Sequence, residues 1–126
     1  MADERVFDSG TRLFIEPDGI VRAVPPRDLV ANEACVAELL EVGRELQATH
    51  GRAALIYDCR PMRSITKSAR QQLVADAPQY LTALALLMRS AINRAAANAV
   101  LRVVRVPIPV RVFGDEADAR RWLKSL

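Results

Sequence analysis

Residues 53–70 have the sequence AALIYDCRPMRSITKSAR. The apolar run Ala53–Tyr57 ends at Asp58 and shows no polar alternation, which predicts a central strand covered on both faces. A polar loop follows, and Thr66 then offers an N-cap to a helix whose apolar residues recur every four positions until Pro78. A buried strand that leads into a helix in this way is typical of α/β proteins.

The chain before this stretch predicts a hairpin and a helix. Two short β-branched segments, 12–15 and 20–24, flank the turn residues 17–19, Pro-Asp-Gly. Proline presets φ for a tight turn and glycine tolerates a positive φ, so the two segments are expected to pair. Apolar residues at three- and four-residue spacing then predict an amphipathic helix over 32–49, which Gly51 ends.

The chain after this stretch predicts two more strands and two more helices. Residues 80–88 fit a helix or a buried strand, and the short length of the run favours a strand. A helix then begins after Ser90, and a strand over 110–113 leads to a C-terminal helix capped by Asp115. The apolar face of the helix after Ser90 comprises Ile92, Ala96, Ala99, Val100 and Val103, and its opposite row comprises Arg94, Asn98 and Arg102.

The order of these elements predicts an α/β fold. Strands that alternate with helices imply right-handed crossovers between parallel strands. We therefore expect a mixed, mostly parallel sheet of about five strands with about four helices, in a single domain over residues 1–126. The first strand of the hairpin is expected to form an antiparallel N-terminal edge.

The composition is that of a soluble protein with one core. The chain has 126 residues, of which 51% are hydrophobic and 26% are charged. The longest apolar stretch, Ala83–Met88, is much shorter than the ~20 residues that span a bilayer. The N-terminus resembles neither a secretory signal nor a transit peptide. We therefore expect a cytoplasmic protein without membrane insertion.

The residues that usually carry chemistry are scarce. The two cysteines, Cys35 and Cys59, form no Cys-x-x-Cys pair, and His50 is the one histidine, so we expect no metal and no cofactor. Cys59 fits a buried structural cysteine better than a reactive thiol. His50 lies at a predicted helix end without a nucleophile motif, and no Gly-rich phosphate-binding motif occurs. The sequence therefore predicts a protein that is not an enzyme.

The charge is uneven along the chain. Residues 1–59 carry six Lys/Arg against eleven Asp/Glu, and residues 60–126 carry twelve against four, so the two parts have net charges of −5 and +8. A basic half attracts anions of every kind, but arginines spaced along amphipathic helices usually form solvated faces. Aromatic residues for base stacking are few, which argues against nucleic acid as a partner.

The element order, the strand-ending Asp58 and the closing strand-turn-helix over 110–126 resemble the SpoIIAA-like or STAS domain, the anti-sigma-factor antagonist fold. The resemblance covers nearly the whole chain. It is strongest to small stand-alone bacterial members without an assigned reaction, in which a polar loop leads to a segment similar to 62–70 here. The resemblance implies a regulatory, non-catalytic protein that binds a protein partner.

The resemblance also points to one surface. In typical members this loop carries an Asp-Ser-Ser-Gly-type motif whose serine is phosphorylated by a partner kinase. Ser68 falls near that position, but the corresponding stretch reads Thr66-Lys67-Ser68-Ala69, without the acidic residue and the glycine. By resemblance, the loop and the start of the following helix form the partner-binding surface, and Ser68 is the candidate phosphorylation site.

Two predicted helix starts at the carboxyl edge of the sheet are cationic. Backbone N–H groups, hydroxyls and arginines together suit an anion, so we hypothesise one shared surface for an anionic ligand or an acidic partner. A simpler interpretation stays open: Thr66 and Ser90 only cap their helices, and the cations are solvated. The candidate binding residues are Asp58, Arg60, Arg63, Ser64, Thr66, Lys67, Ser68, Arg89, Ser90, Asn93 and Arg94.

Two functions from different classes remain. The first is a regulatory protein-interaction module whose partner is another protein or a second copy of this chain. Trp122, Leu123 and Leu126 are candidate apolar contacts for a partner or a copy, but packing within the chain is the default interpretation. The alternative is a small-molecule binding protein. It would hold an anionic or apolar ligand at the carboxyl edge of the sheet, between the helices that begin near Thr66 and Ser90.

Overall fold

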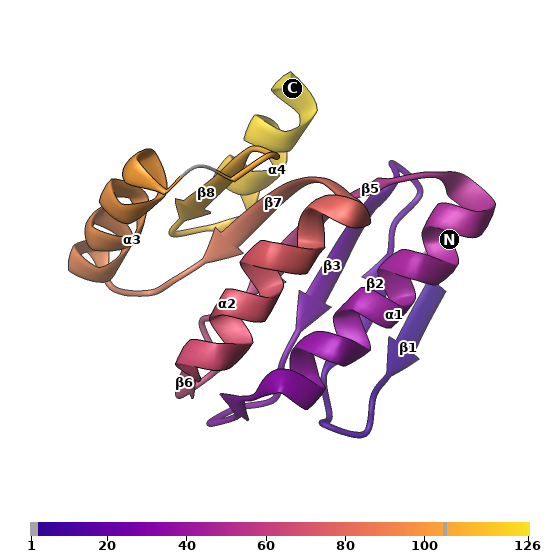
Figure 1. The fold of residues 1–126 in the computed structure, drawn as a ribbon, viewed down its shortest axis with the longest axis horizontal. Helices are drawn as coiled ribbons and strands as arrows, with labels where there is room; N and C mark the ends of the chain where they lie inside the picture. Colours follow the sequence, from indigo (N-terminus) through magenta and orange to yellow (C-terminus); the bar gives the residue numbers. More distant parts are fainter. Residues whose placement is uncertain (1–2, 105) are drawn as a thin grey trace.

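A computed structural model of the chain describes residues 3–104 and 106–126 (Figure 1). The strands are β1 (Asp3–Val6), β2 (Arg12–Ile15), β3 (Ile20–Val24), β4 (Val30–Ala31), β5 (Ala53–Asp58), β6 (Ser64–Ile65), β7 (Leu81–Leu87) and β8 (Val110–Phe113). The helices are α1 (Glu33–His50), α2 (Lys67–Asp76), the short 3₁₀ turn η1 (Ala77–Gln79), α3 (Ala91–Val103) and α4 (Glu116–Ser125).

The main sheet is mixed and mostly parallel, as expected for the predicted α/β class. Six strands lie in the order β1-β2-β3-β5-β7-β8, and β4 pairs with β6 outside this sheet. The first two pairings are antiparallel, and the pairings from β3 to β8 are parallel. The fold class is confirmed, with six strands in place of about five.

The additional strand is β1, at the N-terminal edge. Its sequence, Asp-Glu-Arg-Val, is mostly charged and lacks the apolar signal of a strand. Pairing with β2 orders it, because opposite charges then meet across the strands: the Arg12 guanidinium lies 2.7 Å from the Glu4 carboxylate. The prediction that the first strand of the hairpin forms the edge is therefore wrong, since β2 is an inner strand.

The ambiguous stretch 80–88 is a strand. β7 lies between β5 and β8, and five of its seven residues are buried. Leucine and alanine favour helix intrinsically, so burial on both faces of the sheet overrides that preference here. The prediction of a strand is confirmed.

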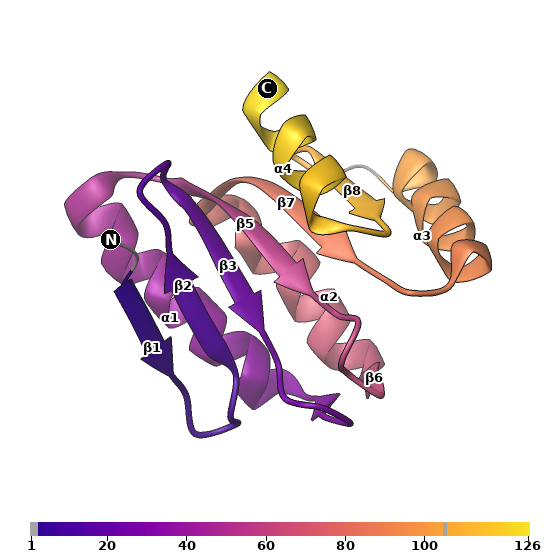
Figure 2. The same cartoon turned by 180° about the vertical axis from the view of Figure 1, so that it is seen from behind.

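Two helices cover one face of the sheet and a third covers the other. The strands β3, β5, β7 and β8 follow one another in chain order, so crossovers of one hand place the connecting helices on the same side. Figure 1 shows α1 and α2 together on one face, and Figure 2 shows α4 on the opposite face, over β5 and β7. The larger core lies under α1 and α2 and includes Leu13, Val36, Leu39, Leu55, Tyr57 and Leu73. A smaller core under α4 includes Ile20, Ile56, Ala85, Leu87, Ala119 and Leu123.

The third crossover helix, α3, lies beside the edge strand β8, away from the other helices (Figure 1). None of its residues is buried. The side chain of Asn98 faces β8 and exchanges two hydrogen bonds with the backbone of Val112. Of the two faces predicted for this helix, the row with Arg94 and Asn98 therefore contacts the protein, and the apolar face points outward.

Candidate functional site

The carboxyl ends of β5 and β7 lie side by side. Asp58 at the end of β5 is paired in register with Leu87 at the end of β7, and the N–H of Cys59 donates to the Leu87 carbonyl at 3.0 Å. The loops that lead to α2 and α3 therefore leave the sheet from adjacent positions. The two loops thus begin side by side at the carboxyl edge of the sheet, where the sequence analysis expected them.

Asp58 is buried and forms a bidentate ion pair with Arg60. The Nε and Nη2 atoms of Arg60 each lie 2.8 Å from a carboxylate oxygen of Asp58, and the backbone N–H of Arg60 donates to the same carboxylate at 3.1 Å. Burial alone would raise the pKa of Asp58, but these hydrogen bonds from Arg60 lower it below its usual value. Asp58 is therefore ionised at neutral pH and fixes the start of the loop.

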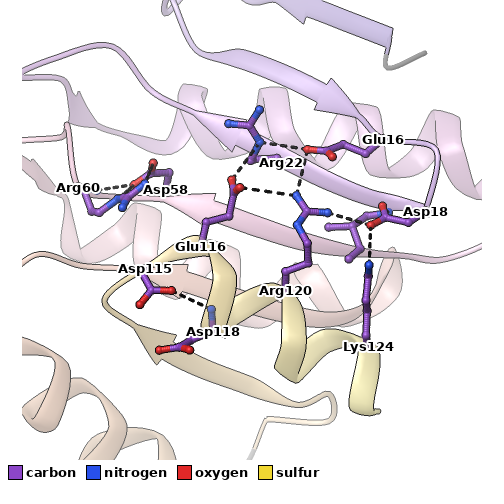
Figure 3. A network of polar contacts seen from close by, with 11 residues as sticks. Glu16, Asp18, Arg22, Asp58, Arg60, Asp115, Glu116, Asp118, Arg120 and Lys124 are labelled. Atoms are coloured by element: carbon purple, nitrogen blue, oxygen red, sulfur yellow. Dashed lines mark hydrogen bonds and ion pairs between the residues drawn. The ribbon is translucent and has the colours of Figure 1, made fainter.

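A larger ionic network, which the sequence analysis missed, lies on the same face of the sheet (Figure 3). Arg22 on β3 is 3.1 Å from Glu16 and 3.2 Å from Glu116 of α4. Arg120 of α4 is 3.1 Å from Glu16 and 2.9 Å from Asp18 in the hairpin turn. Glu16 and Arg120 are 104 residues apart in the chain, so no local pattern could indicate the contact. The network joins α4 to the hairpin.

The loop between β5 and α2 has a fixed backbone. Its residues hydrogen-bond to the segment before α1: Asp28 N–H to the Pro61 carbonyl at 2.9 Å, Arg63 N–H to the Leu29 carbonyl at 2.9 Å, and Thr66 N–H to the Ala31 carbonyl at 2.9 Å. The short pair of β4 and β6 belongs to this set. The segment predicted as an irregular loop thus contains a strand, which forms only because the segment before α1 lies next to it.

At the start of α2, a side chain of α1 meets two hydroxyls. Thr66 caps the helix, since its hydroxyl accepts from the Ala69 N–H at 3.1 Å. The Ser68 hydroxyl donates to the carboxylate of Glu33 in the first turn of α1, and the Thr66 hydroxyl lies 3.4 Å from the same oxygen. Arg63, Ser64, Lys67 and Ser68 are all exposed. Glu33 was not among the predicted residues, because the approach of the two helix starts is a tertiary feature.

The start of α3 is held by its own backbone. The Ser90 hydroxyl accepts from the Asn93 N–H at 3.2 Å and so caps the helix. The guanidinium of Arg94 donates to the carbonyls of Met88 and Arg89 at 2.9 and 2.8 Å. Arg94 therefore closes the loop after β7, while the side chains of Arg89, Ser90 and Asn93 are exposed.

The predicted residues form three groups. Asp58 and Arg60 pair on the α4 side of the sheet, Arg63 to Ser68 surround the start of α2, and Arg89 to Arg94 surround the start of α3. Within residues 3–104 and 106–126, no hydrogen bond or ion pair joins the α2 group to the α3 group. The capping interpretation describes Thr66 and Ser90 well, and the α2 group keeps the larger number of exposed side chains.

The remaining chemical groups offer little reactivity. Burial raises the pKa of the Cys59 thiol to about 12, so the thiol stays protonated at neutral pH. His50 ends α1, and its side chain lies outside the described part of the chain. Among the described residues, no group of three or more His, Cys, Asp or Glu side chains could hold a metal ion.

One hollow lies away from these groups, between α3 and β8. It has a volume of about 250 Å³ and is lined by Asn98, Leu101, Arg102, Val110 and Arg111.

None of the helices described is both long and apolar enough to cross a membrane.

The arrangement of sheet and helices defines a SpoIIAA-like fold. A solved structure with this fold, an uncharacterized protein of the DUF3478 family from Shewanella loihica PV-4, superposes with a TM-score of 0.58 over 98% of this chain and 92% of that chain, at 12% sequence identity. The chain itself belongs to the family DUF7793, a domain of unknown function, whose family model matches residues 13–126. No curated protein matches the sequence. The predicted SpoIIAA-like fold is thereby confirmed.

Proposed function

We propose that the protein is a non-catalytic, regulatory interaction module that binds another protein through the start of α2. The contact surface, here called the α2-start surface, consists of Arg63, Ser64, Lys67 and Ser68. The observation that carries the proposal is the contrast between the fixed backbone of this segment and its exposed side chains.

A fixed backbone favours binding because little conformational entropy is lost when a partner docks. The backbone N–H groups of Arg63 and Thr66 are held by carbonyls of the segment before α1. The side chains beside them are left to face solvent. Of the surface residues, Ser68 also contacts Glu33 of α1, whereas no ion pair with another described residue holds the exposed side chains of Arg63 and Lys67. Ordered backbone that presents exposed side chains is typical of a recognition surface.

The charges of the α2-start surface indicate the kind of partner. Arg63 and Lys67 are exposed, and neither forms an ion pair with another described residue. Unpaired cations at a rim accelerate association with an acidic surface. The partner is therefore expected to present carboxylates to Arg63 and Lys67.

Ser68 provides a means of regulation. Its hydroxyl donates to the Glu33 carboxylate and so links α2 to α1. A phosphate on Ser68 would place further negative charge beside Glu33, and the repulsion would break this link. The surface would then change both its charge and its contact with α1.

A small-molecule site is less well supported at this position. Ligand sites are concave and commonly enclose about 300–1,000 Å³. The residues of the α2-start surface line neither the hollow between α3 and β8 nor the small void under α1. An outward-facing set of side chains on an ordered backbone suits a protein partner better.

The test compares gently isolated complexes by native mass spectrometry. The wild-type chain and two charge-reversed variants are purified from the native host. Arg63→Glu/Lys67→Glu alters the α2-start surface, and Arg44→Glu/Arg121→Glu makes the same charge change on α1 and α4. We expect a protein partner in stoichiometric amount with the wild type and with the second variant, and none with the first.

Three results would count against this proposal. They are a partner retained by Arg63→Glu/Lys67→Glu, a bound small molecule in place of a protein, and the same loss in both variants. The denatured intact mass from the same samples reports on Ser68, since a phosphate-sized increment that Ser68→Ala removes would support the regulatory step.

A further inference from the structure

The outward face of α3 carries most of the large hydrophobic residues that are exposed in the described chain. Ile92 and Val103 are each 82% exposed, Val100 is 58% exposed, and Val104 at the end of the helix is 46% exposed. These are four of the seven large hydrophobic residues that are exposed in the described part of the chain. Such clustering on one element marks interaction sites more often than scattered single residues do.

The helix cannot turn this face inward without losing its anchors. Asn98 donates to the Val112 carbonyl at 3.2 Å and accepts from the Val112 N–H at 3.0 Å, on the edge of β8 that no strand covers. Arg94 holds the carbonyls of Met88 and Arg89. Rotation of α3 would leave these backbone groups unpaired, and an unpaired buried donor or acceptor destabilises the fold. The apolar face is therefore held outward.

The spacing of this face suits a second helix. Ile92, Ala96, Ala99 and Val103 follow at intervals of four, three and four residues, which is the seam pattern of packed helices. The two central residues are alanines, which allow a close approach of another backbone. We call these four residues the α3 seam.

The charges beside the α3 seam are all positive. No Asp or Glu occurs between Asp76 and Asp115, whereas five arginines do. Of these, Arg89, Arg102 and Arg111 are exposed and form no ion pair with another described residue. Arg102 belongs to the row that includes Asn98, about a quarter turn from the seam, and together with Arg111 it lines the hollow between α3 and β8.

We propose that the α3 seam and its flanking arginines bind an acidic amphipathic helix of a protein partner. Apolar side chains of that helix would pack on Ile92 and Val103, and its carboxylates would pair with Arg102 and Arg111. This surface is separate from the α2-start surface, and either proposal can fail without the other.

Two other occupants fit less well. A second copy would bring its own arginines to a surface whose neighbouring charges are also arginines, and like charges would then oppose each other. A membrane surface favours large and aromatic side chains, and the centre of the seam is alanine.

The probe is a designed, fluorescently labelled helical peptide of roughly three heptads, with leucine at the seam positions and glutamate beside them. Fluorescence anisotropy measures its affinity for the full chain at low salt. The test variants are Ile92→Ser/Val103→Ser and Arg102→Glu. The matched control is Val6→Ser, because Val6 is a similarly exposed valine on β1.

We expect the peptide to bind the wild type, Val6→Ser and Arg63→Glu/Lys67→Glu alike. Ile92→Ser/Val103→Ser and Arg102→Glu should each weaken binding by at least about tenfold. A peptide in which lysine replaces every glutamate should not bind. Because all the substituted residues are exposed, circular dichroism is expected to show unchanged folding in each variant.

The proposal is overturned if the acidic peptide does not bind the wild type, or if it binds the two α3 variants equally well. Sedimentation velocity and flotation with phosphatidylglycerol vesicles address the other occupants. Self-association that Ile92→Ser/Val103→Ser abolishes would assign the seam to a second copy. Vesicle binding that the same variant abolishes would assign it to a membrane surface.

Discussion

The helices α1 and α3 have similar apolar spacing, but the fold uses them in opposite ways. On α1 the apolar stripe faces the sheet, and Cys35, Val36, Leu39, Leu40, Val42 and Leu46 are buried. On α3 the apolar stripe faces solvent, and the polar residues Arg94 and Asn98 contact the protein. Periodicity therefore establishes that a helix is amphipathic without deciding which face packs.

The two helices pack different faces because each lies against a different part of the sheet. α1 lies over the centre of the sheet, where the backbone groups are already paired and only apolar side chains face it. α3 lies beside β8, an edge strand with unpaired backbone groups, so a side chain with both a donor and an acceptor is needed there. Burial of one Val or Ile side chain is worth about 1.5–3 kcal/mol, which is stabilisation that α3 leaves for a partner.

The largest expected effect comes from α1. Leu39 is 7% exposed and packs in the larger core, so Leu39→Ala is expected to lower the free energy of unfolding by about 2–5 kcal/mol. Urea denaturation followed by circular dichroism measures this value. A loss below about 1 kcal/mol would mean that α1 does not anchor the core, and the contrast with α3 would disappear.

The second largest effect is expected from Asn98, whose side chain attaches α3 to β8. Asn98→Ala removes both hydrogen bonds to Val112, and we expect a loss of about 1–3 kcal/mol in the free energy of unfolding, together with faster hydrogen exchange at the Val112 amide. The control is Asn93→Ala, because the Asn93 side chain is exposed on the same helix and the gain in helix propensity is similar. Equal exchange rates in the two variants would contradict the anchoring role.

Acidification distinguishes the contacts of Leu39 and Asn98 from the ionic network that joins α4 to the hairpin. Burial alone would raise the pKa of Asp18, but the backbone hydrogen bond from Ile20 and the charge of Arg120 lower it overall. Because its pKa is lower in the folded state, ionised Asp18 stabilises the fold at pH values above its unfolded-state pKa of about 3.9. This stabilisation is lost as the pH falls through the folded-state pKa.

Arg120→Ala is therefore expected to lower the free energy of unfolding by up to about 1 kcal/mol at neutral pH, and the deficit should vanish in acid. The deficits of Leu39→Ala and Asn98→Ala should persist in acid, since neither contact contains a titrating group. Unfolding curves collected from neutral pH to about pH 2.5 report all three. If the loss of unfolding free energy in Arg120→Ala does not depend on pH, the contact between α4 and the hairpin is not ionic in origin.

The smallest effect is expected on the outward face of α3. Ile92 is 82% exposed, so Ile92→Ala should change the free energy of unfolding by no more than about 0.5 kcal/mol. The same urea titration as for Leu39→Ala gives a direct comparison of the two stripes. A loss as large as that of Leu39→Ala would show that the stripe is buried in solution.

Much of the fold could be predicted because its signals are local. The predicted caps Thr66, Ser90 and Asp115 each accept a hydrogen bond from the N–H three residues later. The strand-turn-strand at Pro17-Asp18-Gly19 also forms, with Gly19 at a φ of 83°. Each of these features depends on a few neighbouring residues, and local sequence is sufficient to specify them.

The candidate site was predicted only in part. The sequence indicated the loop after Asp58, and the structure fixes that loop as a surface through hydrogen bonds to 28–31. The contact of Ser68 with Glu33 and the network from Glu16 to Arg120 escaped prediction. β1 escaped as well, because its charged sequence becomes a strand only beside β2.

By itself, the sequence determined the four helices and the five strands β2, β3, β5, β7 and β8, together with the helix caps and the burial of the central strands. Periodicity and capping act over a few residues along the chain, so these features can be predicted locally. Only the tertiary structure decided which face of α3 packs, which charges pair and which cations stay unpaired. These outcomes depend on which segments, distant in sequence, the sheet order brings together, and on which backbone groups are left at its edge. A local pattern contains no information about either.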